Sequence, residues 1–170
     1  AQVRAIASGA LSNGDTVIVN SDGTVSAVAA DGNPESIGTA VVFETGSTAY
    51  SSCAYDAANN KIVIAYRDAG DSDKGKAVVG TVSGTSITFG TPVVFASGGA
   101  AFSVAVYEPV AEKVVIFYAD GGNSNYGTGI VGTVSGTSIS FGTATVFNSG
   151  TSYWNSAAYD ANAQKIVVST

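Results

Sequence analysis

The chain has 170 residues, only 12% of them are charged, and the formal net charge is −6. This acidic balance argues against binding to nucleic acid or to an anionic membrane, because both attract basic clusters. No apolar run approaches the roughly 20 residues that a bilayer-spanning helix needs, so no membrane insertion is expected. The mean hydropathy of +0.27 favours β structure with two covered faces over disorder.

Residues 1–23 are interpreted as an N-terminal lead-in. Two β-branched runs, residues 14–19 and 24–28, flank an Asp22-Gly23 pair. Asp-Gly is typical of a tight hairpin turn, because its residues tolerate a positive φ. The lead-in therefore predicts a β-hairpin, and Pro34 then ends the pattern because it removes a hydrogen-bond donor.

An internal repeat organises the rest of the chain. Residues 80–87 return letter for letter as residues 132–139, displaced by 52 positions. The same displacement relates three sets of residues without any insertion or deletion: Phe43, Phe95 and Phe147; Tyr55, Tyr107 and Tyr159; Lys61, Lys113 and Lys165. Such self-similarity is typical of repeat architectures and decides the fold before any single residue does.

Each period holds four apolar runs separated by turn-rich stretches; in the middle copy they are residues 77–83, 86–95, 101–107 and 113–118. No segment carries an amphipathic helical pattern, so an all-β fold of tandem four-stranded antiparallel repeats is predicted. A period near 50 is typical of β-propeller blades. The array over residues 24–170 is divided into three blade-like units, about 24–67, 76–119 and 128–170, with residues 83–85 as the hairpin turn between the first two strands of a blade.

Three blades do not close a ring, because closed propellers have about 4 to 8. Three solutions stay open: subunits combine, further blades follow residue 170, or the units stack without closing. Open strand edges need covering, so a homo-oligomer or a filament is expected.

Cys53 is the only cysteine, which excludes an intramolecular disulfide and a cysteine-based metal site. Its counterparts one and two periods later are Ala105 and Ala157. The sequence therefore predicts a small buried residue at this position rather than a reactive thiol.

An acidic loop is the first candidate site. Asp68, Asp71 and Asp73 lie within six residues among glycines, and Ca²⁺ prefers such hard oxygen ligands. The next copy replaces two of the three acids by Asn123 and Asn125. Because Asp and Asn also cap their own backbone in loops, the interpretation as turn residues is favoured over a calcium site, and no other cofactor is predicted.

Aromatic residues give the second candidate. Tyr50, Phe102 and Trp154 recur at the repeat distance and are predicted to pack between repeats. Tyr153 does not recur and is the better surface candidate; with Tyr126 and Trp154 it would form a sugar-stacking platform.

Catalysis has little support in the sequence. The chain has no histidine, which excludes imidazole-based triads and metal sites. Glu108, Glu112 and Asp56 lie in turns that recur as structural positions. We therefore expect no catalytic residues and no enzyme.

Residues 113–143 resemble repeats in structural and tail-fibre proteins of marine phages, cyanophages among them, and residues 7–17 resemble segments that precede such arrays. The resemblance implies a virion-surface or extracellular protein whose partners are further copies, other virion proteins and host-surface glycans. Similar arrays occur in bacterial surface proteins. The alternative functions are thus a bacterial surface or secreted lectin-like module and, with least support, a glycan-degrading propeller enzyme.

Overall fold

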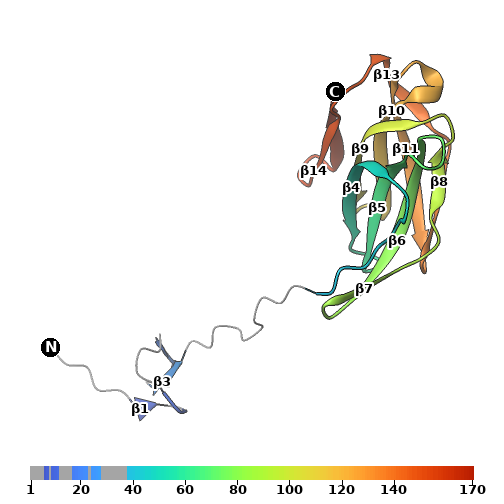
Figure 1. The fold of residues 1–170 in the computed structure, drawn as a ribbon. Helices are drawn as coiled ribbons and strands as arrows, with labels where there is room; N and C mark the ends of the chain where they lie inside the picture. The colour runs from blue at the N-terminus through green and yellow to red at the C-terminus, as the bar shows by residue number, and fades with distance from the viewer. Residues whose placement is uncertain (1–5, 8, 12–16, 23, 28–37) are drawn as a thin grey trace. The chain divides into compact units, whose positions relative to one another are not determined.

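The computed structural model describes residues 6–7, 9–11, 17–22, 24–27 and 38–170 (Figure 1). Strands dominate these residues, the sheets are almost wholly antiparallel, and the one helix described is the short 3-10 turn η1 (Gly121–Asn123). The predicted all-β fold class is therefore confirmed. Within the same residues, no helix has the length and apolar character that crossing a bilayer demands.

The chain divides into two compact units, residues 1–37 and 38–170, so the boundary falls later than the predicted residue 23. The first unit contains β1 (Ile6–Ala7), β2 (Val17–Val19) and β3 (Thr24–Ala27). β2 and β3 pair as the predicted hairpin, with Val17 opposite Ala27, and β1 runs parallel to β3. Asp22 accepts hydrogen bonds from the backbone N–H and the hydroxyl of Thr24. Because the hydrogen bonds of β3 go to β1 and β2, this strand belongs with the lead-in.

Two five-stranded sheets form the body of the second unit. The first sheet contains β4 (Thr48–Asp56), β5 (Lys61–Asp68), β6 (Lys74–Ser83), β7 (Ser86–Phe89) and β8 (Val93–Ala96). The second sheet contains β9 (Ala100–Glu108), β10 (Lys113–Asp120), β11 (Tyr126–Ser135), β12 (Ser138–Phe141) and β13 (Thr145–Thr151). A separate hairpin follows, made of β14 (Ser156–Asp160) and β15 (Lys165–Ser169). The strands β9 to β12 begin and end 52 residues after β4 to β7.

The strands are grouped differently from the predicted units. β5 pairs with β6 over nearly its whole length, from Ile62 opposite Gly80 to Asp68 opposite Lys74. The predicted units 24–67 and 76–119 placed these two strands in different blades, and units 76–119 and 128–170 did the same for β10 and β11, which also pair. Those predicted boundaries are wrong, because the strands on either side of each acidic loop are hydrogen-bonded to one another.

The repeated residues 80–87 do form a hairpin, with Ser83 opposite Ser86 and Gly84 in the left-handed region at φ 58°. The hairpin joins the third and fourth strands of the first sheet, not the first two. The fourth strand is interrupted: β7 pairs with the end of β6 and β8 with its beginning. Pro92 lies between them and has no N–H to donate to a continuous ladder.

The two sheets pack face to face, with β9 against β4 (Figure 1). Strand β14 of the separate hairpin lies against β9 in turn. Phe95 in the first sheet contacts Tyr118 and Phe141 of the second, with ring centroids 5.2 and 5.8 Å apart. Phe43 contacts Tyr66 and Phe89 of the first sheet in the same manner, at 5.1 and 5.9 Å. The core between the sheets is built of small and branched side chains, chiefly Ala54, Val63, Ala65, Ala77, Val79, Val114, Ile116 and Ile130.

Cys53 is exposed, so the prediction of a buried residue is wrong. Its counterpart Ala105 is buried because β4 packs over β9, where the Ser52 hydroxyl accepts a hydrogen bond from the Ala105 N–H. Cys53 lies on β4, the edge strand of the first sheet, on the side directed away from β9.

Candidate functional site

The three candidate calcium ligands lie at the end of β5 and in the loop that follows it. The acidic loop connects β5 to β6, and Lys76 of β6 forms ion pairs with two of its carboxylates. Lys76 Nζ lies 2.7 Å from Asp68 Oδ2 and 2.8 Å from Asp71 Oδ2, while Lys74 Nζ lies 2.8 Å from Asp71 Oδ1. Asp68 also accepts hydrogen bonds from the N–H groups of Gly70 and Asp71. Two carboxylates are thus already bound to ammonium groups of the same chain.

These ion pairs perturb the ionisation of all three groups. Hydrogen bonds from Lys74 and Lys76 lower the pKa of Asp71 to about 2. The hydrogen bond from Lys76 holds the pKa of Asp68 below its ordinary value, and the pKa of Lys76 is raised by its bonds to both acids. Near neutral pH, Asp68 and Asp71 are therefore ionised and Lys76 is protonated.

The third predicted calcium ligand, Asp73, faces elsewhere. Its Oδ1 lies 3.2 Å from Arg67 Nε as an ion pair, without the geometry of a hydrogen bond. Across the part of the chain that the structure describes, no three acidic, histidine or cysteine side chains come together as a metal-binding group. Asp68, Asp71 and Asp73 are thus not brought together; two of them share a lysine and the third pairs with an arginine.

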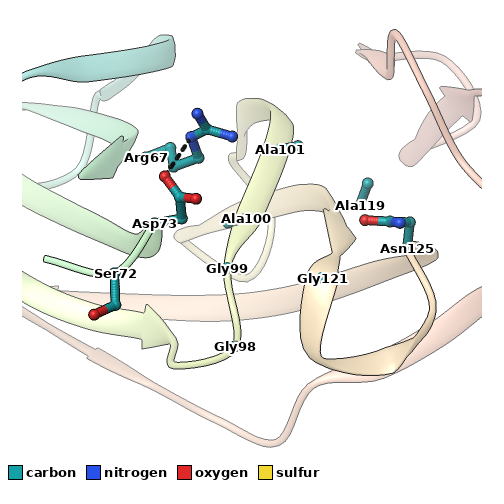
Figure 2. A pocket seen from close by; sticks show the side chains of 10 residues that line it. All are labelled: Arg67, Ser72, Asp73, Gly98, Gly99, Ala100, Ala101, Ala119, Gly121 and Asn125. Atoms are coloured by element: carbon teal, nitrogen blue, oxygen red, sulfur yellow. Dashed lines mark ion pairs between the residues drawn. The ribbon is translucent and has the colours of Figure 1, made fainter. Parts of the chain in front are cut away.

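A pocket of about 230 Å³ lies between the acidic loop and its counterpart in the second sheet (Figure 2). Arg67 and Asp73 form one wall, and Asn125 and Gly121 form the opposite wall. Between them run Gly98, Gly99 and Ala100, which expose only backbone and a methyl group. Figure 2 shows the Ser72 side chain directed away from the ion pair. The pocket therefore offers one compensated pair of charges and one amide.

Aromatic rings in mutual contact form a row beside this pocket. The Tyr50 and Phe102 ring centroids are 4.5 Å apart, and those of Phe102 and Trp154 are 4.8 Å apart. Tyr153 also contacts Phe102, edge to face, at 5.2 Å. The guanidinium group of Arg67 covers the Tyr50 ring at 5.0 Å from its centroid, a cation–π geometry. We call Tyr50, Phe102, Tyr153 and Trp154 the aromatic row.

The backbone explains why three of these rings lie in register. Tyr50, Phe102 and Trp154 all have positive φ, between 52° and 59°. In β4 the regular register breaks between Ala49 and Ser52, and in β9 it breaks opposite the Phe117–Ala119 segment. A bulge of this kind redirects a side chain out of the normal alternation. Each bulge turns its aromatic ring toward the ring of the next repeat.

The predictions for the aromatic residues have mixed outcomes. Phe102 contacts Tyr50 and Trp154 of the neighbouring repeats, as the predicted packing between repeats requires, but Trp154 is 79% exposed, so the row lies at the surface and not inside the core. Tyr153 is exposed as predicted, and it joins Trp154 on Phe102. Tyr126 begins β11, and no ring contact is described between it and the other two.

Sequence reasoning missed the polar residues beside the row. Ser51, Ser103 and Asn155 each follow an aromatic residue of the row by one position. They line a second pocket of about 180 Å³ together with Tyr50, Phe102 and Trp154. The 52-residue displacement that relates the three rings also relates Ser51, Ser103 and Asn155. The repeat distance could therefore have identified these polar residues.

Comparison with protein-family models, curated proteins and solved structures finds no match for this chain.

Proposed function

We propose that the chain is a non-enzymatic structural module of a phage virion or appendage, built of propeller-like 52-residue blades, which works by assembling with further copies of itself. The resemblance of residues 113–143 to tail-fibre repeats supports the setting. One structural observation carries the role in assembly: the outer face of the second sheet is open, although the same face of the first sheet is buried.

The exposed fractions of equivalent side chains differ between the two sheets. Phe95 is 8% exposed and its counterpart Phe147 is 39% exposed. Val79 is 1% exposed and its counterpart Val131 is 46% exposed. Phe95 and Val79 are covered because the second sheet packs on them. Among the described residues, no complete sheet packs against Phe147 and Val131.

The open face has the chemistry of an interface. It is chiefly apolar, with Val115, Phe117, Gly129, Val131 and Phe147 at least partly exposed, and the ring of Phe117 lies edge to face against Phe147 at 5.6 Å. Exposed contiguous apolar surface of this kind marks sites of association. Next to it, β15 pairs only with β14 in the described structure, so its other edge is a free row of hydrogen-bonding groups.

A second copy of the chain suits this face because the two ends of the repeat array complement one another. Residues 38–44 lie against the first sheet as residues 90–96 lie against the second, with Phe43 in the place of Phe95. They correspond to the last strand of a repeat, whereas β14 and β15 correspond to the first two strands of one. Head-to-tail association therefore combines two partial repeats into one. Two copies with three blades each would close a ring of six, within the usual range of about 4 to 8.

The oligomeric state tests this proposal. We expect the 170-residue chain to sediment as a dimer at micromolar concentration and Val131→Asp to sediment as a folded monomer. Val110→Asp is the matched control, because Val110 is also exposed but lies in the turn between β9 and β10; this variant should remain dimeric. A monomeric parent chain, or a Val131→Asp variant that still dimerises, would refute the assembly role.

The setting needs a separate measurement. Mass spectrometry of purified virions should find the protein there in stoichiometric amount. If it is found instead in the cell-surface fraction of uninfected bacteria, the lectin-like alternative replaces the virion assignment while the assembly result still stands.

A further inference from the structure

We propose that the aromatic row and the pocket beside it form a binding site for a neutral carbohydrate, in which sugar rings stack on Trp154 and sugar hydroxyls bond to Ser103 and Asn155. The site uses no residue of the open face of the second sheet, so the Val131→Asp variant separates sugar binding from the assembly proposed above.

The exposed rings supply the apolar half of the site. Trp154 presents most of its surface to solvent, and Tyr50 and Tyr153 are also exposed. Phe102 holds them in place from behind, because it contacts all three rings. Rigid aromatic surface that does not have to be ordered on binding suits a flat ligand with one apolar face.

Two buried polar atoms supply the other half. Ser103 is 8% exposed, and its hydroxyl has no hydrogen-bond partner. The Asn155 Oδ1 atom is also buried without a partner, while its Nδ2 donates to the Phe102 carbonyl oxygen at 3.2 Å and so fixes the amide. Both residues line the same pocket as Trp154. Buried polar groups normally have partners, so two unpaired atoms in one pocket indicate a ligand that brings its own donors and acceptors.

The backbone keeps this arrangement at a conformational cost. Tyr50, Phe102 and Trp154 all adopt the left-handed region, which residues other than glycine seldom occupy. Strain of this kind persists where the surrounding structure imposes it and is concentrated at ligand sites. Its recurrence at three equivalent positions shows that the repeat itself builds the row.

The lining selects a class of ligand. The six residues of the pocket are Tyr50, Ser51, Phe102, Ser103, Trp154 and Asn155, and none carries a formal charge. An ionic ligand would find no counter-charge among these six residues, and the guanidinium group of Arg67, which covers the Tyr50 ring, is already paired with Asp73. A hexose has an apolar face of C–H groups and a rim of hydroxyls, each of which both donates and accepts, and therefore matches rings and unpaired polar atoms together. An apolar peptide side chain would use the rings alone.

Fluorescence reads this site directly, because Trp154 is the only tryptophan of the chain. We would titrate the full chain with methyl hexopyranosides and with neutral di- to tetrasaccharides and record tryptophan emission, followed by calorimetry for the sugars that respond. We expect a saturable emission shift with at least one sugar. Asn155→Ser, which installs the residue found at positions 51 and 103, should weaken binding by about fivefold or more through loss of a hydrogen bond.

The controls separate the site from the fold and from assembly. Tyr55→Ala removes an exposed tyrosine from the opposite end of β4 and should leave affinity unchanged, as should Val131→Asp. The proposal is overturned if no neutral sugar shifts the emission of the folded chain, if Asn155→Ser binds as tightly as the parent, or if an apolar peptide shifts the emission and the sugars do not.

Discussion

The two five-stranded sheets of this protein have nearly the same strands and different environments. Phe95 and Phe147, or Val79 and Val131, occupy equivalent positions, but the members in the first sheet are buried and those in the second are half exposed. The difference therefore does not lie in local sequence. It arises because each sheet of a repeat array is covered by its neighbour, so that burial is a property of position in the array.

The largest test of this comparison replaces the two phenylalanines. Phe95→Ala should lower the free energy of unfolding by about 3–5 kcal/mol, the usual cost of removing a buried phenylalanine. Phe147→Ala should cost about 1 kcal/mol or less in the monomer, because its ring is already partly hydrated. Urea denaturation of both variants in a Val131→Asp background, which keeps the chain monomeric, measures the difference. Equal losses would show that the two faces are covered to the same degree.

A matched pair of glycines gives the next largest effect. A methyl group at Gly90 would overlap the backbone carbonyl oxygen of Thr137 in the second sheet, whereas at Gly142 the nearest atom outside its chain neighbours is the Val131 oxygen at 3.8 Å. We expect Gly90→Ala to cost about 2 kcal/mol or more through displacement of the β11–β12 hairpin. Gly142→Ala should be close to neutral. Thermal unfolding of the two variants under one condition decides the matter, and a neutral Gly90→Ala would contradict the described contact between the sheets.

Another pair of glycines should show no difference at all. Gly84 and Gly136 occupy the turns of the two repeated hairpins at φ 58° and 61°, and neither would place a methyl group near another atom. Each substitution by alanine should cost about 1 kcal/mol, because only glycine adopts a positive φ freely. Chemical denaturation should therefore give the same loss for both. A larger loss at either one would reveal a contact that the repeat does not share.

Much of this fold was predictable from the sequence. The Asp22-Gly23 pair and the repeated residues 80–87 correctly predicted hairpins, because turn chemistry is local. The boundaries of the units were not predictable, because a period fixes the distance between equivalent residues and not the point at which a unit begins. The position at which a unit begins is shown only by the hydrogen bonds between β5 and β6, the two strands that the acidic loop connects.

The candidate site was less predictable for a related reason. The three acids of the loop predicted calcium by composition, but the partners that occupy them, Lys74, Lys76 and Arg67, depend on which side chains share a face of the sheet. Likewise, the spacing of Tyr50, Phe102 and Trp154 indicated contact between repeats. It did not indicate that bulges bring the rings to the surface next to Ser103 and Asn155.

The acidic loops provide the smallest and most specific test of the difference between the sheets. The first sheet has Asp71 with Lys74 and Lys76, while the second has Asn123, Tyr126 and Thr128 at the same places. The ordinary pKa of 3.8 falls to about 2 for folded Asp71. A lowered folded pKa means that its ion pairs stabilise the fold at pH values above the ordinary pKa and lose that effect as the pH falls from about 4 to about 2.

Asp71→Asn should therefore lower the Tm at pH 7 and flatten the fall of Tm between pH 4 and pH 2, while Asp68 retains part of that slope because its pKa is lowered as well. Scanning calorimetry across this range measures both effects. The reciprocal change, Asn123→Asp, places a carboxylate where the second sheet has no lysine to receive it, so it should add no stability at pH 7. If that variant became more stable at pH 7 and acquired the same acid transition, the loop alone, and not the lysines of β6, would set the ionisation of the acid.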